Sequence, residues 1–152
     1  MLNITLVTIG KIKETYLKEA ADSYLKRLKP YGRLRLEELK AEPFSATTKT
    51  KAKKIEAERL QAFLDHKSEA EIYLLSERGE LLDTLKFAAR VGLNQELVLV
   101  IAGSLGFAPE LEKKYPAISL SPLTFPHELA RVILLEQIYR AATILNNKEY
   151  HY

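Results

Sequence analysis

The sequence contains no cysteine. This absence excludes disulfides, thiolate metal ligands and a cysteine nucleophile, and it suits a reducing compartment. No stretch reaches the roughly 18 uncharged apolar residues that a membrane span needs. The opening run MLNITLVTIGKIKE lacks a basic segment before its apolar residues and is too short for a signal peptide. Repeats, linkers and low-complexity segments are missing as well, so the 152 residues predict a single soluble, cytoplasmic domain.

Several common catalytic signatures are also missing. The histidines at positions 66, 127 and 151 do not have metal-ligand spacing, so we expect no metal. There is no Gly-x-Ser-x-Gly elbow, no acidic pair of the glycosidase type and no P-loop. His66, at a predicted helix end, is expected to be a cap or solvated. His127, at the start of the last helix, fits a cap and a site residue equally well.

The charge is unevenly distributed. The whole chain carries a formal net charge of +3, but residues 1–54 carry +7 and residues 55–152 carry −4. A basic region of this kind is typical of proteins that bind polyanions, because Lys and Arg neutralise phosphates. The alternative is that KTKAKK and YLKRLKPYGRLR are ordinary solvated surface. Composition leaves both readings open.

Apolar periodicity predicts strands that alternate with helices. The predicted strands cover residues 3–9, 33–39, 70–76, 96–104 and 117–120, and the predicted helices cover residues 14–28, 51–65, 81–93, 108–115 and 126–145. A polar loop is expected at 40–50, and RGE at 78–80 is expected to be the exit turn of the third strand. The alternation predicts one α/β domain with a mostly parallel sheet.

The last helix is apolar over most of its circumference. A polar side is expected to include Glu128, Arg131, Glu136, Arg140, Thr143 and Asn147. Apolar residues fill the remaining sides, which indicates a helix buried on two sides. We therefore predict a homodimer formed through residues 129–145.

Two loops and the last residues are candidates for a site. AGSLGF (102–107) follows a buried strand and precedes a helix, so it is either a tight turn or a surface that a ligand approaches closely. SLSPLTFPHE (119–128) is stiffened by two prolines and is either a rigid corner or a preorganised ligand site. The closing NNKEYHY places an imidazole between two phenols. Arg140 interrupts an apolar helix and should meet an anion or a cleft.

Four segments together resemble the RlmH family from end to end. They are LVTIGKIKETYLKEAADSYLKRLKPY, LVIAGSLGF, ISLSPLTFPHELARVILLEQIYRA and the terminal YHY. The RlmH family comprises S-adenosyl-L-methionine-dependent methyltransferases of the trefoil-knotted SPOUT class, which modify a pseudouridine of 23S ribosomal RNA. The run LTFPHELARV…EQIYRA with an aromatic-His close is its most specific part.

The resemblance implies a fold and a cofactor site. It implies one SPOUT domain over residues 1–152, with a C-terminal trefoil knot and a knotted cofactor-binding region at about 70–152. It also implies a homodimer. By motif match, the methyl donor would be held by Leu75, Ala102, Gly103, Leu120, Ser121, Pro122, Leu123, Thr124 and Phe125. Ala102 departs from the family's usual glycine, so we do not expect it to approach the cofactor as a glycine would.

The resemblance also implies a reaction, which is methylation of N3 of a pseudouridine on the assembled 70S ribosome. The tail would lie near the cofactor of the partner subunit. His151 is then the candidate general base, since an imidazole titrates near working pH. Arg140 would stabilise the developing ring anion, and Tyr150 would stack on or hydrogen-bond the base. A SPOUT-like tRNA methyltransferase and a non-catalytic dimeric RNA- or ribosome-binding module remain alternatives.

Overall fold

A computed structural model describes residues 1–93 and 95–152 of the chain. The strands are β1 (Leu2–Ile9), β2 (Gly32–Leu39), β3 (Glu71–Leu81), β4 (Leu97–Ile101) and β5 (Ala117–Ser119). The α-helices are α1 (Thr15–Leu28), α2 (Lys49–Leu64), α3 (Thr84–Val91), α4 (Pro109–Lys114) and α5 (His127–Leu145). The sheet order is β2-β1-β4-β3-β5, and every neighbouring pair is parallel. The predicted α/β class is therefore confirmed.

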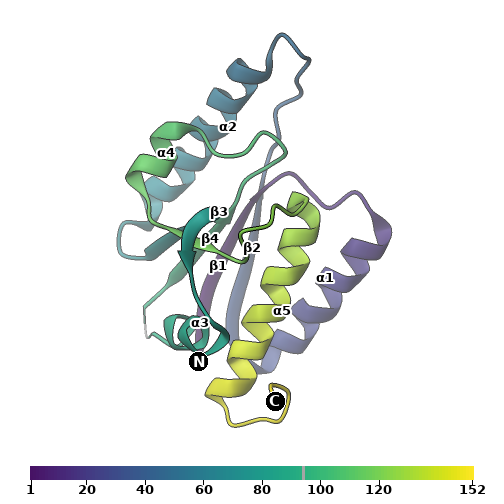
Figure 1. Cartoon of the computed structure of the whole chain (residues 1–152), viewed down its shortest axis with the longest axis vertical. Coiled ribbons are helices and arrows are strands. Elements are labelled where there is room, and N and C mark those ends of the chain that lie inside the picture. The colour runs from purple at the N-terminus through teal and green to yellow at the C-terminus, as the bar shows by residue number, and fades with distance from the viewer. Residues whose placement is uncertain (94) are drawn as a thin grey trace.

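Helices cover both faces of the sheet (Figure 1). One core joins α1, α3 and α5 to one face, and a second core joins α2 and α4 to the other. Every residue of β4 is buried, because this central strand has a helical layer on each side. That explains why LVLVI is a continuous apolar run and does not alternate.

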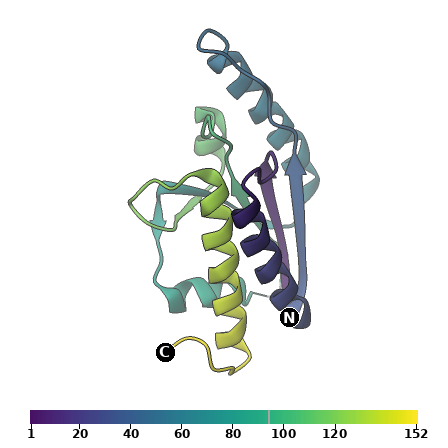
Figure 2. The same cartoon turned by 90° about the vertical axis from the view of Figure 1, so that its right-hand side faces the viewer.

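Helix α5 is covered on more than one side by its own chain. It packs on the sheet, and α1 and α3 contact it; Figure 2 shows α1 alongside it. The apolar circumference that suggested a second subunit is thus partly satisfied within one chain, and the homodimer stays a prediction. The expected polar side is interrupted, because Arg131 is only 3% exposed and Thr143 only 1%.

The predicted turn at residues 78–80 is wrong. β3 continues to Leu81, and its register with β5 shifts between Leu75 and Glu80, both of which pair with Ile118. A Cβ on Gly79 would lie 2.6 Å from the carbonyl carbon of Ala117, so this close backbone approach requires glycine. The sequence signal for a turn was in fact the signal for a β-bulge.

Other boundaries differ by a few residues. The fourth strand ends at Ile101, before the predicted end at 104, and α2 begins at Lys49 within the predicted loop. Helix α3 starts at Thr84, after the expected start at 81, because the Asp83 side chain caps it by accepting from the Lys86 backbone N–H at 2.8 Å. Among the described helices, none combines the length and apolar character needed to cross a membrane.

Candidate functional site

A cavity of about 510 Å³ lies at the carboxyl ends of β4 and β5 and beside residues 75–78 of β3. Its volume is within the roughly 300–1,000 Å³ typical of small-molecule sites. Three segments surround it, namely the bulge of β3 between Leu75 and Glu80, the loop after β4, and the loop between β5 and α5. Its lining comprises Lys53, Leu75, Ser76, Glu77, Arg78, Ile101, Ala102, Gly103, Ser104, Leu105, Gly106, Phe107, Glu112, Leu120, Ser121, Leu123, Thr124, Phe125, Pro126, His127 and Ala130. Ligands of parallel α/β sheets bind at this edge.

Eight of the nine predicted cofactor residues line this one cavity. They are Leu75, Ala102, Gly103, Leu120, Ser121, Leu123, Thr124 and Phe125. Pro122 is exposed and is not among the lining residues. Its contribution is to the loop backbone, because proline restricts both its own φ and the residue before it.

The loop after β4 is shaped by glycine. A Cβ on Gly103 would lie 3.0 Å from Cγ2 of the buried Ile9. Gly106 has φ +74°, and its N–H donates to the Gly103 carbonyl at 3.0 Å. Gly103 lets the loop backbone lie directly against Ile9, and the positive φ of Gly106 allows the turn that follows. This arrangement allows a ligand to contact the backbone directly.

The loop before α5 is fixed by two serines. The Ser119 hydroxyl donates to the Ser121 carbonyl at 2.8 Å, and the Ser121 hydroxyl accepts from the Leu123 N–H at 3.0 Å. Pro126 occupies the N-cap position of α5, as the sequence predicted. Leu123 is 71% exposed. The loop is therefore held from within, and it presents an apolar side chain that has no partner in its own chain among the described residues.

Several lining residues were not identified from the sequence. Arg78 forms an ion pair with Glu112 and lies 3.3 Å from Glu77, so three charged groups meet at the rim. His127 lines the cavity, and Pro126, not His127, occupies the N-cap position of α5. Lys53 enters from α2. Arg78 and Glu77 could have been found only by recognising the bulge that turns them towards the cavity.

The predicted catalytic residues form a second cluster, at the other end of α5. Arg140 donates to Glu136 Oε1 at 2.6 Å, and its Nη1 lies 3.2 Å from His151 Nδ1. The Tyr150 hydroxyl donates to the same Glu136 oxygen at 3.1 Å. Its ring packs edge-on against Tyr139 at 4.8 Å between centroids and lies under the Arg140 guanidinium at 4.9 Å. The structure therefore brings Arg140, Tyr150 and His151 together, and their catalytic roles stay a prediction.

Tyr150 is a half-buried anchor of this cluster. Burial, followed by its hydrogen bond to Glu136, raises the pKa of the Tyr150 phenol to about 12. The phenol therefore remains protonated at neutral pH, and it cannot act as a general base there. His151 is exposed. A guanidinium carries only donors, so its contact with Nδ1 uses the imidazole lone pair and places the proton of neutral His151 on Nε2.

The cavity and the tail cluster are separated by α5. The helix spans 19 residues from His127 to Leu145, and at 1.5 Å per residue its ends are about 28 Å apart. In Figure 2 the C-terminus lies at the opposite end of α5 from the loop that precedes the helix. One chain therefore does not join the predicted cofactor residues to the predicted catalytic residues.

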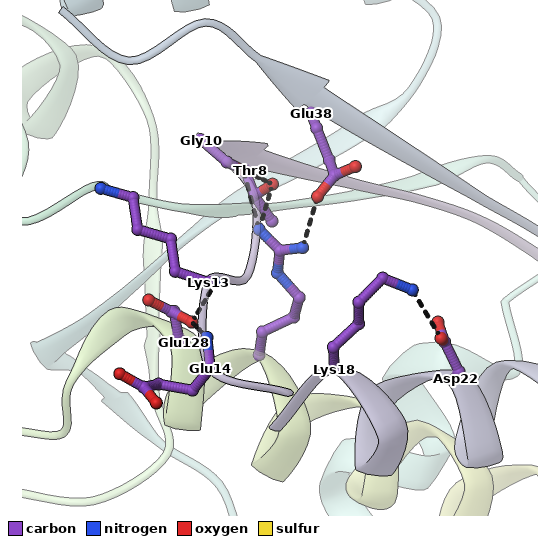
Figure 3. Close-up of polar contacts among 9 residues, drawn as sticks. Thr8, Gly10, Lys13, Glu14, Lys18, Asp22, Glu38 and Glu128 are labelled. Atoms are coloured by element: carbon purple, nitrogen blue, oxygen red, sulfur yellow. Dashed lines mark hydrogen bonds and ion pairs between the residues drawn. The ribbon is translucent and has the colours of Figure 1, made fainter. Parts of the chain in front are cut away.

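The N-terminal half of α5 is tied to the end of β1. Arg131 donates to Glu38 at 2.7 Å, to the Thr8 hydroxyl at 2.8 Å and to the Gly10 carbonyl at 2.9 Å. Glu128 accepts from the backbone N–H groups of Lys13 and Glu14 at 2.7 and 3.2 Å. Figure 3 shows Thr8, Gly10 and Glu38 around one guanidinium, with Glu128 against the loop after β1. These contacts fix the helix end beside the cavity.

Residues 1–93 and 95–152 contain no group of three or more histidine, aspartate or glutamate side chains placed to hold a metal ion. The cavity lining combines apolar walls, such as Leu75, Leu120 and Phe125, with hydroxyl groups and with charged side chains at the rim. This combination suits an organic ligand with a flat ring and polar edges.

The family model for a predicted SPOUT methyltransferase matches residues 2–151. A ribosomal RNA large subunit methyltransferase H of Pelobacter propionicus is 36% identical, with 99% of this chain and 100% of the relative covered. The protein of that name in Trichlorobacter lovleyi is 37% identical over the same shares of the two chains.

Solved structures show the same fold at lower sequence identity. A probable methylase family protein from Haemophilus influenzae superimposes with a TM-score of 0.61 at 16% identity, covering 100% of this chain and 72% of that one. A structure described as giving insights into the 2-OH methylation of C/U34 on tRNA has a TM-score of 0.52 at 17% identity, covering 97% and 99%. These two likenesses concern the fold alone.

Proposed function

The chain belongs to the SPOUT methyltransferase family, and from this premise we propose that it transfers a methyl group from S-adenosyl-L-methionine to 23S ribosomal RNA. The observation that carries the proposal is the convergence of eight motif-matched residues on one cavity. Relatives that are 36–37% identical over the whole chain are named ribosomal RNA large subunit methyltransferases. We further propose that the cofactor-binding region at about 70–152 is the knotted part of the single domain 1–152.

The cavity fits the proposed cofactor. Its Leu and Phe walls suit an adenine ring, and the backbone of the loops after β4 and β5 can hydrogen-bond the edge of that ring. Gly103 leaves no room for a side chain beside Ile9, so the donor would meet backbone at this point. Ser121 and Thr124 would contact the polar parts of the cofactor. When bound, S-adenosyl-L-methionine supplies an activated methyl group with a neutral leaving group.

We propose that the complete site needs two copies of the chain. The tail cluster contacts α5 at Glu136 and Arg140, which lie about 14 to 20 Å along the helix axis from His127 at the cavity. A two-fold dimer in which the α5 helices lie antiparallel would place the tail of each chain at the cavity of its partner. Leu129 and Leu145 are exposed on α5, and Leu123 is exposed on the adjoining loop. These apolar side chains could contact the partner subunit.

The tail residues would prepare the nucleotide for attack. N3 of a uracil-type ring must lose its proton before or during methyl transfer, because the protonated imide nitrogen is a poor nucleophile. His151 would accept this proton, but its Nδ1 lone pair faces Arg140. We infer that the developing ring anion draws Arg140 to itself, which releases Nδ1 for proton transfer. Tyr150 holds the tail in place and offers its ring edge to the base.

The finer substrate is proposed to be N3 of a pseudouridine on the assembled 70S ribosome. The described residues form a single five-stranded α/β unit around the cavity, and we propose that the ribosome presents the nucleotide to it on a preformed surface. A protein that acts on assembled ribosomes works in the cytoplasm.

Radiolabelled S-adenosyl-L-methionine tests the proposal on ribosomes from a strain that lacks the modification. We expect label on assembled 70S particles, mapped to one pseudouridine, with much less on separated subunits and free RNA. Label on transfer RNA instead would favour the tRNA enzyme. Cofactor binding without transfer to any RNA would favour a non-catalytic module, and either result would overturn the proposal.

His151→Ala tests the general base. We expect a fall in kcat of about 10²- to 10⁴-fold, with loss of the acidic limb of the pH–rate profile. Tyr152→Ala is the matched control, because Tyr152 is 99% exposed and belongs to the same tail. An unchanged kcat across the pH range in His151→Ala would make His151 a packing residue.

A further inference from the structure

Helix α2 begins with four lysines in its first six residues. Lys49, Lys51, Lys53 and Lys54 lie there, and its first turn contains no acidic residue. The N-terminus of a helix carries a partial positive charge, so each cation in the first turn costs about 0.3–1 kcal/mol. The lysine cluster therefore destabilises the helix that carries it. A role in binding an anion would account for its presence.

None of these lysines is neutralised within the described part of the chain. No ion pair within 4 Å joins Lys49, Lys51, Lys53 or Lys54 to a carboxylate of residues 1–93 or 95–152. Arg59, on the same helix, shows the contrast, since it pairs with Glu42 at 2.7 Å. The positive charge is thus concentrated at the start of α2.

The four lysines divide between two sides of the helix. Lys49 and Lys53 are one turn apart, on the side of the buried Ala52 and Glu56. Lys53 itself lines the cavity. Lys51 and Lys54 project from other sides, since successive residues turn by about 100°, and both are exposed.

The start of α2 extends beyond the sheet. Figure 1 shows the first turns of α2 and the preceding loop at the top of the molecule, past the strands, and Figure 2 shows the same projection from the side. The second half of the helix packs on the body, where Leu60 and Leu64 join the core with Val98 and Val100. In the first half, Ala52 and Glu56 are also buried, and the lysines lie at the outer end of the helix beside the cavity.

We propose that Lys49 and Lys53 form a phosphate-binding surface that guides the RNA backbone to the cavity; this inference rests on the proposed function. The pair continues the cavity wall outward, so a nucleotide whose base enters the cavity mouth would place its neighbouring phosphates along α2. Lysine is suited to this role, because its compact charge on a flexible stem binds phosphates without a fixed geometry. Lys51 and Lys54 lie outside the path.

Two double variants with equal charge test this surface. Lys49→Gln with Lys53→Gln removes the cavity-side pair, and Lys51→Gln with Lys54→Gln is the matched control on the same helix. Glutamine has nearly the helix propensity of lysine, and each variant lowers the net charge by two. We would measure ribosome binding by co-sedimentation between 50 and 200 mM salt, together with methyl transfer and the Kd of S-adenosyl-L-methionine.

We expect the cavity-side variant to bind ribosomes about tenfold more weakly and to reduce the slope of log K against log[salt] by roughly 1.4, the value for two single-strand phosphate contacts. The control should lose much less. Equal losses in the two variants would overturn the inference, because net charge alone would then explain them. A greater loss in cofactor affinity than in ribosome affinity would assign Lys53 to the cofactor instead.

The same experiment tests the proposed function separately, through methyl transfer by the wild-type chain. If the wild-type chain transfers no methyl group to RNA but the cavity-side variant loses ribosome affinity selectively, the binding surface stands and the enzyme assignment fails. If the wild type methylates 70S particles and both variants match it in ribosome affinity and salt slope, the enzyme assignment stands and the binding surface fails.

Discussion

The two ends of helix α5 are built in different ways. At its N-terminal end, loops that contain glycine and proline border an open cavity, whose lining mixes apolar, hydroxyl and charged side chains. At its C-terminal end, Glu136, Arg140, Tyr150 and His151 form a closed network of hydrogen bonds. The first arrangement suits binding and the second suits proton chemistry. Their separation along one helix is the basis of the proposal that binding and catalysis are contributed by different copies of the chain.

The largest effect is expected from mixing chains that are each defective at one end. Thr124→Trp fills the cavity from an exposed loop position, and His151→Ala removes the base. Each variant alone should be at least about 100-fold less active. Co-expressed with different tags and purified together, they should recover roughly a quarter of wild-type methyl transfer, because about half of the dimers are mixed and each contains one intact site.

Thermal unfolding of both variants is the control for folding in this experiment. If cavity and tail of the same chain formed the site, mixed dimers would contain two broken sites and activity would not recover. Leu123→Trp repeats the test from a second exposed lining position, so that poor expression of one cavity variant does not decide the outcome.

The two arginines of α5, Arg131 and Arg140, should have different roles. We expect Arg131 to support stability and Arg140 to support methyl transfer. The Arg131 side chain is 4% exposed and the Arg140 side chain 26%. Arg131→Met leaves Glu38 and the Thr8 hydroxyl without their donor, and we expect a loss of about 3 kcal/mol in the free energy of unfolding. Arg140→Met should cost less than about 1 kcal/mol, yet lower methyl transfer at least about tenfold.

Urea unfolding at fixed protein concentration, alongside kcat, checks both arginine variants. Equal destabilisation by Arg131→Met and Arg140→Met would contradict the expected difference between the two arginines. Lys18→Met is a surface control, because its ion pair with Asp22 is exposed on both sides, and we expect little change in the free energy of unfolding.

The tail network should give stability a specific dependence on alkaline pH. The Tyr150 phenol has its pKa raised to about 12, whereas in the unfolded chain it titrates near 10. The contribution of Tyr150 to the free energy of unfolding is fully present below pH 10. It is lost as the pH rises towards 12, because the unfolded chain then releases a proton that the folded chain retains. Allowing for solvent screening, we expect about 1 kcal/mol.

Unfolding of Tyr150→Phe measured from pH 9 to 12 isolates this contribution. The variant should show a shallower fall in stability over that range than the wild type, and Tyr152→Phe should behave as the wild type. Parallel curves for Tyr150→Phe and the wild type would show that Tyr150 is not desolvated by the tail network.

The smallest effect is expected at Ala102 in the cavity wall. Ala102→Gly removes one methyl group from a half-buried lining position. The loss of one methyl contact is worth at most about 0.8 kcal/mol, so the Kd of S-adenosyl-L-methionine should change by no more than about fourfold. Calorimetric titration measures it. A change of tenfold or more in either direction would show that this methyl group sets the depth of the cavity.

Much of this arrangement could be predicted from local patterns. The buried run LVLVI identified the central strand, the amphipathic periodicity of residues 14–28 identified α1, and the loop motifs identified residues that meet at one cavity. The RGE segment could not be interpreted in this way, because whether a glycine makes a turn or a bulge depends on the strand beside it. Here the backbone of β5, about 40 residues later, packs against Gly79. This contact makes the segment part of the strand and not a turn.

The sequence by itself determined the element types, the parallel α/β class and the identity of the loop residues, because these depend on short-range sterics and on periodic burial. Only the tertiary structure decided which distant groups share a site. It buried Arg131 against Glu38, 93 positions away, brought Lys53 of α2 into the wall of the cavity, and placed His151 at the far end of α5. Such contacts depend on how helices pack across a sheet, and no local pattern in the sequence records that packing.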